Sequence, residues 1–334
     1  METDEKISAK LQEIENICIY YSMGRDIYDS LKDTLQKNPG TEIIVSPANL
    51  GDSVFIATLA NAYKKTYGVK NLIIVAKERQ ADAMEWFEGV DGTLPLNDYQ
   101  MLCLRYYFTI SRRFYENGIR YGHIPCDIEV NAPLTFFHIP PGFGGMSLMN
   151  VWKKRIFELP DDCELGDIVV SADNIPFENE DKYKNAILIA PAAFTNKGIP
   201  ESFWEKLTAE FKARGLEVYC NSGGLPYDTV IKGSKELILS TKELIVNAGF
   251  FKGIVAVRSG FTDLVSKTDA KLCVLHLGGT VDTPIRVEYG TNADDVRDLG
   301  RMEGICPMRY CADREDEIIS LILKDMSGDV FGEI

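Results

Sequence analysis

The stretch TEIIVSPANLGDSVFIATLANAYKKTYGVKNLIIV, residues 41–75, decides the fold of this chain. Its apolar run at 42–46 ends before Pro47, and apolar residues then recur at helical spacing over 53–67. A second apolar run follows at 71–75. A strand, a loop, a helix and another strand, with nearly continuous apolar strands, predict a parallel sheet covered on both faces.

The same order of elements returns in the second half of the chain. Its pattern predicts strands at 186–190, 216–220, 253–257 and 271–275, and helices at 201–214 and 261–268. Two successive βαβ halves predict an α/β protein with two Rossmann-like domains and a cleft between them. We expect the first domain at 1–175, the second at 176–310, and a docking helix with its tail at 311–334.

Helical patterns surround the first βαβ half. Residues 5–37 repeat apolar side chains every three or four positions, at Ile7, Leu11, Ile14 and Ile17, and Gly24 is a possible break. Shorter helical patterns occupy 98–116, 151–159 and 314–324, whereas 121–145 has the Gly and Pro content of a loop. The first 37 residues therefore form an amphipathic helix ahead of the sheet.

Length and charge narrow the possible functions. The 334 residues exceed what a single hydrophobic core usually supports, so two domains are expected. With 36 basic and 50 acidic residues the net charge is −14, which disfavours nucleic-acid partners and electrostatic attachment to anionic lipid. The start lacks signal-peptide features and no apolar run is long enough for a transmembrane segment. We expect a cytoplasmic protein, either in solution or at the inner face of the membrane.

The loop after the first strand carries a candidate base. Asn49, Gly51 and Asp52 stand between the strand and the helix, at the edge of a parallel sheet where ligands bind. An Asp at a helix N-terminus stays ionised and can accept a proton from a substrate hydroxyl. The alternative, that Asp52 only caps the helix, is compatible with this role.

The loop at 191–200 carries a candidate phosphate ligand. Phe194, Thr195 and Asn196 lead to Lys197, which is the only charged side chain between the strand and the helix that follows. A lysine beside a helix start can neutralise a phosphate. The alternative is an ordinary solvated surface lysine.

The loop at 258–263 combines an arginine with a helix start. Arg258 follows a buried strand, and Ser259, Gly260, Phe261, Thr262 and Asp263 open the next helix. A guanidinium beside unpaired backbone N–H groups suits a phosphate. The alternative is a surface pair between Arg258 and Asp263, although their spacing is not that of a helical ion pair.

Other standard sites are missing from the sequence. It contains no Gly-x-Gly-x-x-Gly, no P-loop and no Gly-x-Ser-x-Gly. The eight cysteines fit no standard zinc spacing, and no Asp-x-Asp pair could hold a divalent metal on a diphosphate. We therefore expect no metal site and no cofactor. The three histidines, His123, His138 and His276, show no relay spacing and are interpreted as structural.

At these three loops the sequence resembles the ADP-heptose:lipopolysaccharide heptosyltransferase-like glycosyltransferases, whose GT-B fold has two facing Rossmann-like domains. Asn49-Leu-Gly-Asp52 is similar to the family's Gly-Asp segment, whose Asp is the base. The loop ending at Lys197 is similar to the one that reaches the donor phosphate. Residues 258–263 occupy the place of the family's Asp-Thr/Ser-Gly-x-x-His motif, whose amides hold the diphosphate.

Two departures limit this resemblance. Arg258 stands where the family usually has Asp, and Asp263 where it usually has His. Gly198-Ile199 also replaces the aromatic residue that follows the lysine. Arginine can add a phosphate contact but cannot accept a hydrogen bond from a sugar hydroxyl. The resemblance therefore implies the glycosyltransferase class but not ADP-heptose as the donor.

The resulting hypothesis is a glycosyltransferase of polysaccharide biosynthesis. It would move a sugar from a nucleotide-diphosphate sugar to a glycan or lipid-linked glycan, with inversion and without a metal. Asp52 would be the base, and Lys197, Arg258 and the amides at 259–263 would stabilise the leaving diphosphate. Two alternatives remain open, a sugar-nucleotide epimerase and a non-catalytic nucleotide-sugar binding subunit.

Overall fold

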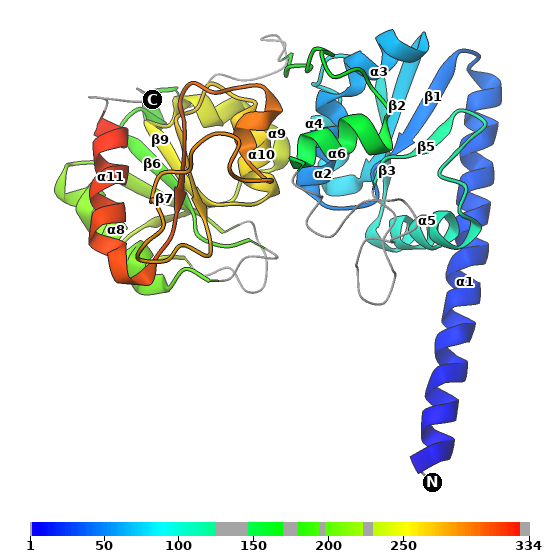
Figure 1. Cartoon of the computed structure of the whole chain (residues 1–334), viewed down its shortest axis with the longest axis horizontal. Helices are drawn as coiled ribbons and strands as arrows, with labels where there is room; N and C mark the ends of the chain where they lie inside the picture. Colours follow the sequence, from blue (N-terminus) through cyan, green and yellow to red (C-terminus); the bar gives the residue numbers. More distant parts are fainter. Residues whose placement is uncertain (1, 124–145, 170–179, 194–197, 223–229, 328–334) are drawn as a thin grey trace. The chain divides into compact units, whose positions relative to one another are not determined.

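The computed structural model describes residues 2–123, 146–169, 180–193, 198–222 and 230–327. The chain forms two compact units, the first comprising 1–146 and 150–166 and the second 147–149 and 167–334. The domain boundary expected at 175–176 lies outside the described residues. Each unit is built around its own sheet (Figure 1).

The sheet of the first unit has five strands in the order β3-β2-β1-β5-β4. All neighbours are parallel except β4 and β5. The strands are β1 (Thr41–Val45), β2 (Asn71–Lys77), β3 (Gly92–Leu96), β4 (Tyr115–Glu116) and β5 (Ile119–Tyr121). The expected strands at 42–46 and 71–75 are thus confirmed to within two residues, and β3, β4 and β5 are additional.

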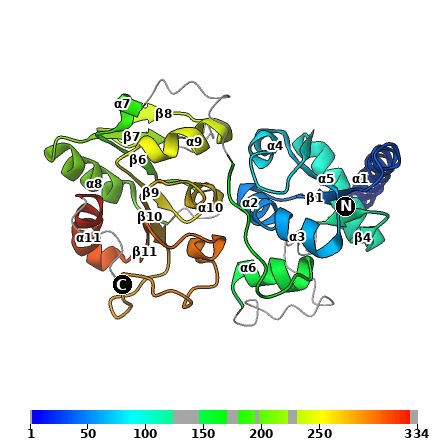
Figure 2. The same ribbon diagram turned by 90° about the horizontal axis from the view of Figure 1, so that it is seen from above.

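Helices cover both faces of this sheet (Figure 2). On one face, α1 (Glu2–Lys37) and α5 (Asp98–Ser111) pack side chains such as Tyr28 and Leu104 against Ile43. On the other lie α2 (Leu50–Thr58) and α3 (Ala60–Tyr67), which replace the single helix expected over 53–67. The remaining short helices are α4 (Glu78–Met84), α6 (Leu148–Val151) and a π-helical turn (Trp152–Ile156).

Gly24 does not break the first helix. It is buried inside the continuous α1, and a Cβ at this position would overlap the carbonyl oxygen of Cys103 in α5. The missing side chain lets the two helices cross closely. The glycine is therefore a packing position rather than a helix stop.

The sheet of the second unit has six strands in the order β11-β10-β9-β6-β7-β8, all parallel. They are β6 (Ala186–Ala190), β7 (Glu217–Asn221), β8 (Lys235–Leu237), β9 (Gly253–Val257), β10 (Leu272–His276) and β11 (Ile305–Arg309). The strands β6 and β9 match the expected residues, and both are buried at every position. Continuous burial is what a parallel sheet covered on both faces requires.

Helices also cover both faces of the second sheet (Figure 2). On one face α8 (Glu201–Ala213) and α11 (Glu315–Ser327) share a core that includes Trp204 and Ile318. On the other lie α9 (Thr241–Asn247) and α10 (Gly260–Ser266). Further short elements are α7 (Glu180–Tyr183) and 3₁₀ turns at Ala248–Phe250, Val296–Leu299 and Ala312–Arg314. The docking helix expected at 314–324 is α11, and it packs within the second unit.

Each sheet has a point at which the chain reverses the direction of strand addition. In the first unit β2 and β3 are added on one side of β1, and β5 then joins on the other. In the second unit β7 and β8 are added on one side of β6, and β9 joins on the other. Ligands of open α/β sheets bind beside such switch points, at the carboxyl ends of the strands. The loops after β1, β5, β6 and β9 are therefore the places to search for a site.

Candidate functional site

The switch point of the first unit brings together the segments after β1 and β5. The chain leaves β1 through Ser46 and Pro47, and Asn49 is the N-cap of α2 with Asp52 three residues later. The backbone N–H of Asn49 donates to Asp52 Oδ2 at 3.1 Å. Asp52 is therefore the N3 residue of the capping box and not the N-cap itself. This bond uses its Oδ2, and its Oδ1 takes no part in it.

His123 lies beside that second oxygen. Its Nε2 is 3.6 Å from Asp52 Oδ1, and the two side chains are 18% and 26% exposed. His123 follows β5, which pairs with β1, so the topology of the sheet sets the two residues next to each other. The pair is accessible to a small molecule at the edge of the sheet.

Several effects act on the ionisation of Asp52. Burial raises the pKa of its carboxyl, but hydrogen bonding and charge from His123 and the backbone N–H groups of Asn49 and Asp52 outweigh it. The net result is a pKa below the ordinary value, so the carboxylate is ionised at neutral pH. An ionised, partly exposed carboxylate can accept a proton from a bound hydroxyl.

Aromatic rings and buried polar groups hold this pair in place. The ring of His123 meets Trp152 edge to face with centroids 5.8 Å apart, and Trp152 stacks on Phe55 of α2 at 5.3 Å. Beneath them, Ser53 bonds to Ser46 at 2.8 Å and to Gln80 Oε1 at 3.0 Å, all buried. The start of α2 is thereby tied to the ends of β1 and β2, which limits the movement of Asp52.

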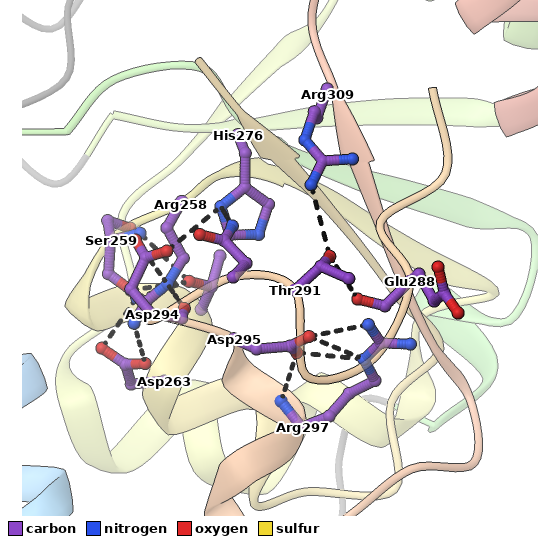
Figure 3. A network of polar contacts seen from close by, with 12 residues as sticks. Arg258, Ser259, Asp263, His276, Glu288, Thr291, Asp294, Asp295, Arg297 and Arg309 are labelled. Atoms are coloured by element: carbon purple, nitrogen blue, oxygen red, sulfur yellow. Dashed lines mark hydrogen bonds and ion pairs between the residues drawn. The ribbon is translucent and has the colours of Figure 1, made fainter. Parts of the chain in front are cut away.

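The switch point of the second unit carries a closed network around Arg258, which follows β9 (Figure 3). Its Nη1 donates to Asp263 Oδ2 at 3.0 Å, and its Nη2 lies 2.9 Å from Asp263 Oδ1. Its Nε donates to the carbonyl of Asp294 at 2.7 Å, and Nη1 also donates to the carbonyl of Ser259 at 3.0 Å. The side chains of Arg258 and Asp263 are 8% and 3% exposed.

The sequence left two interpretations of Arg258 open, a phosphate ligand and an ion pair with Asp263. The structure contains the ion pair with Asp263. The pair is buried rather than on the surface, because Asp263 lies on the first turn of α10 and points back toward β9. The acidic neighbours, Asp263 first and then Asp294, outweigh the effect of burial and raise the pKa of Arg258. The guanidinium holds the loop and the helix start together.

His276 and a second ion pair extend this network (Figure 3). His276 ends β10, is buried, and has its Nδ1 3.1 Å from Asn292 Nδ2 and 3.7 Å from Asp294 Oδ1. Burial lowers the pKa of His276 to about 4, so its ring is neutral at pH 7. Nearby, the buried Asp295 and Arg297 are joined by bonds of 2.7–3.1 Å.

The residues predicted to bind substrate fall into three groups. Asn49, Gly51, Ser259, Gly260 and Phe261 are partly or fully exposed. Arg258, Thr262 and Asp263 are buried, and the backbone N–H of Ser259 donates to Thr262 Oγ1 at 3.0 Å. Phe194, Thr195, Asn196 and Lys197 lie outside the described residues.

His123 is the residue that the motifs did not indicate. All three histidines were interpreted as structural, whereas the structure sets this one against the candidate base. The only signal in the sequence is its position directly after the short apolar segment that becomes β5. This position indicates that His123 lies near Asp52 only if β5 is known to pair with β1.

The described segments lack both a metal-ligand cluster and a membrane-spanning helix. They contain no cluster of three or more His, Cys, Asp or Glu side chains arranged as metal ligands. None of their helices is both long and apolar enough to cross a bilayer.

Comparison with known proteins finds relatives only at the level of structure. No protein-family model and no curated protein matches the sequence. Among solved structures, the chain is similar to Escherichia coli heptosyltransferase WaaC with ADP (13% identity, TM-score 0.53), covering 86% of this chain and 99% of that one. It is also similar to a family 9 glycosyl transferase from Veillonella parvula (10% identity, TM-score 0.53), covering 86% and 91%.

A third solved structure agrees with these two. The ADP-heptose LPS heptosyltransferase II of E. coli has 12% identity and a TM-score of 0.51, with 85% of this chain and 99% of that one covered. At such identities the likeness shows the fold alone. The expected GT-B-like fold, with two mostly parallel sheets and alternating helices, is confirmed.

Proposed function

We propose that this protein is a glycosyltransferase that moves a sugar from a nucleotide-diphosphate sugar to a hydroxyl of a glycan or lipid-linked glycan. The observation that carries the proposal is the ionised, partly exposed carboxylate of Asp52 beside His123 at the switch point of the first sheet. The GT-B-like fold supports it, because similar solved structures include the heptosyltransferase WaaC, described once with ADP and once with ADP-2-deoxy-2-fluoro heptose.

In this proposal Asp52 is the base. Its carboxylate takes the proton of the acceptor hydroxyl while the hydroxyl oxygen bonds to the anomeric carbon of the donor sugar. The bond from that carbon to the diphosphate breaks, and its electron pair leaves with the nucleoside diphosphate. Attack from the face opposite the leaving group inverts the anomeric configuration. His123 holds the carboxylate ionised and oriented, and so acts as a positioning residue.

The second unit would receive the leaving diphosphate. By resemblance, Lys197 with Phe194, Thr195 and Asn196 forms one side of this subsite, and the exposed backbone of Ser259, Gly260 and Phe261 forms the other. Arg258 has a different role from the one its position first suggested, because its donors already bond to groups of its own unit. It stabilises the loop that presents those residues, together with Thr262 and Asp263.

Several finer points belong to the same proposal. The reaction would need no metal and no cofactor, because the sequence has no Asp-x-Asp pair and Lys197 with the helix-start amides would meet the diphosphate of the donor substrate. The protein would act in the cytoplasm or at the inner face of the membrane, where such an acceptor is accessible. Asn49 and Gly51 would contact the acceptor beside Asp52.

The first experiment identifies the donor and then tests the base. Thermal-shift screening against nucleoside diphosphates and their sugars should single out one base and sugar, since a ligand at 100 times its Kd adds about 2.7 kcal/mol of stability. With that donor, Asp52→Asn should lower turnover by about 10²–10³-fold, as expected when a general base is lost. Asp82→Asn, the same change at an exposed site on α4, should have no effect.

The products separate the proposal from its alternatives. A free nucleoside diphosphate and a new glycoside of inverted configuration, detected by NMR, support transfer. An altered sugar nucleotide without a new glycoside would instead identify an epimerase. Tight donor binding with no Asp52-dependent turnover or hydrolysis would identify a non-catalytic binding subunit.

A further inference from the structure

Helix α1 has two parts that differ in their surroundings. Its C-terminal part packs on α5, where Tyr20 lies 4.9 Å from Tyr106 between ring centroids and Tyr28 is buried. Its N-terminal part extends beyond the sheet and α5 (Figure 1). There Leu11 and Ile14 are 57% and 56% exposed. Within the part of the chain that the structure describes, these two apolar side chains of the extended part therefore lie largely in solvent.

A seven-residue repeat runs through both parts of the helix. Apolar residues stand every seven positions at Ile7, Ile14, Tyr21, Tyr28 and Leu35. If these are the d positions of a heptad, the a positions are Asp4, Leu11, Cys18, Arg25 and Lys32. The central a positions of the extended part, Leu11 and Cys18, are therefore apolar, whereas Asp4 at its N-terminal end and the a positions that pack on the same unit are charged. Apolar a and d residues together are the pattern of a helix that packs against another helix.

We propose that the extended part of α1, residues 4–21, pairs with the same segment of a second copy of this chain in a parallel two-stranded coiled coil. The stripe that would form this interface is continuous, through Tyr21, with the stripe by which α1 packs on its own unit. An isolated helix of this length is marginal in water, and packing of an apolar face is what normally stabilises it. The proposal is independent of the proposed function.

Charges beside the stripe set the direction of pairing. In this heptad Lys10 occupies a g position and Glu15 the following e position, and both are exposed. In a parallel dimer each g residue faces the next e residue of the partner, so Lys10 would meet the partner's Glu15 twice across the two-fold axis. An antiparallel arrangement places g opposite g and e opposite e, and this complementarity is lost. The charges therefore favour the parallel dimer.

A lipid surface suits this segment less well. The residues flanking the stripe include Glu13 and Glu15, and the chain carries a net charge of −14. Helices that lie on membranes usually have basic residues on their polar face. A second copy matches both the repeat and the charges, whereas an anionic bilayer matches neither.

The first test measures the mass of the full chain in solution. Sedimentation equilibrium should show a concentration-dependent dimer of twice the 37.4 kDa chain mass. Ile14→Lys should give a monomer whose two units keep their urea unfolding transition, because this side chain is exposed in the single chain. Leu102→Lys, at an exposed apolar site on α5, should leave the dimer intact. A native chain that stays monomeric up to about 100 µM overturns the proposal, even if it binds vesicles.

The second test reads the direction of pairing from charge reversal. Lys10→Glu or Glu15→Lys alone should weaken the dimer about tenfold, because each sets like charges opposite one another. The double variant Lys10→Glu, Glu15→Lys should restore the native dissociation constant. If the double variant is as weak as the single ones, the parallel pairing is wrong.

The third test uses Cys18, an exposed free thiol at an a position. In a parallel dimer two a residues face each other, so mild oxidation by diamide should join the two Cys18 thiols. Each thiol loses a proton and an electron, and diamide takes up both pairs. Cys18→Ser should abolish the covalent dimer, and Ile14→Lys should abolish it although Cys18 is retained. A native dimer that forms no Cys18 disulfide would be antiparallel and would overturn the proposal.

Discussion

The two switch points of this protein have the same topology but very different side chains. In the first sheet, the segments after β1 and β5 bring together Asp52 and His123, 3.6 Å apart and 26% and 18% exposed. In the second sheet, the segment after β9 carries Arg258 and Asp263, joined at 2.9 and 3.0 Å and only 8% and 3% exposed. One pair is partly exposed to solvent, and the other is enclosed.

The difference in exposure suits the two pairs to different roles, although both lie at switch points. A group that accepts a proton from a substrate must be reachable by that substrate and must be ionised at the working pH. Asp52 meets both conditions, because it is accessible and ionised. A buried, bidentate ion pair costs desolvation energy and fixes geometry instead. Arg258 and Asp263 therefore stabilise the loop between β9 and α10.

The largest expected effect of a mutation on stability comes from removing one partner of the buried Arg258–Asp263 ion pair. Arg258→Ala leaves the carboxylate of Asp263 buried without its cation. Removing one partner of a buried ion pair typically costs about 3–5 kcal/mol in the free energy of unfolding. Urea unfolding of the purified variant measures this loss. Replacing both partners together, Arg258→Met with Asp263→Leu, should cost less than the single change.

A surface ion pair of the same unit provides the matched control. Lys235 and Glu217 lie 2.8 Å apart on neighbouring strands and are 59% and 49% exposed. Lys235→Ala should lower the free energy of unfolding by about 1 kcal/mol or less. If Arg258→Ala costs no more than Lys235→Ala, the enclosed network does not stabilise the loop, and the contrast between the two switch points fails.

The next largest effect is a pH dependence that His276 gives to the second unit. The pKa of its ring falls from 6.5 in the unfolded chain to about 4 in the fold, because burial opposes the charged form. Between these values the unfolded chain binds a proton that the folded chain does not. The contribution of the neutral His276 to the free energy of unfolding is therefore complete above pH 6.5. It decreases as the pH falls toward 4, by on the order of 3 kcal/mol.

His276→Gln tests this dependence, because glutamine keeps a polar side chain that does not titrate. The native chain and the variant should differ in how the free energy of unfolding changes between pH 6.5 and 4, with the steeper loss in the native chain. Other titrating groups are common to both and cancel in the difference. Equal slopes would mean that His276 is protonated in the fold at pH 5.

The two sheets also differ in how well the sequence predicted them. The strands β6 and β9 were located correctly because every residue is apolar and buried, which is a strong local signal. By contrast, β3 contains Gly92 and Pro95, and it forms only because an edge strand tolerates a missing N–H. The strand β5 has only three residues and lies between the helical pattern predicted at 98–116 and the loop predicted from 121. Its pairing with β1 is a long-range contact without a local signature.

The candidate site shows the same limit. Asp52 could be predicted as a candidate base because a Gly-Asp segment between a strand and a helix is visible in the sequence. His123 was not found, because its importance depends on β5 lying beside β1, some 75 residues earlier in the chain. The burial of Arg258 was also missed, since the turn that brings Asp263 back toward β9 depends on how α10 packs. Pairings across the sheet, more than local patterns, decide the chemistry.

The smallest effect tests whether His123 positions and ionises Asp52. Without the hydrogen bond and charge of His123, burial should raise the pKa of Asp52. Since the base must be ionised, the acidic limb of the pH–rate profile should move to higher pH in His123→Gln. Turnover near neutral pH should fall by about tenfold, which is less than for Asp52→Asn.

Stability provides the discriminating control for this last prediction. His123 is partly exposed, so His123→Gln should change the free energy of unfolding by less than about 1 kcal/mol. A loss of turnover without any shift of the acidic limb would mean that His123 only packs against Trp152. A shift of the acidic limb of the pH–rate profile with unchanged stability would instead show that His123 controls the ionisation of Asp52. Only the second result preserves the contrast between an open, reactive pair in one sheet and an enclosed, structural pair in the other.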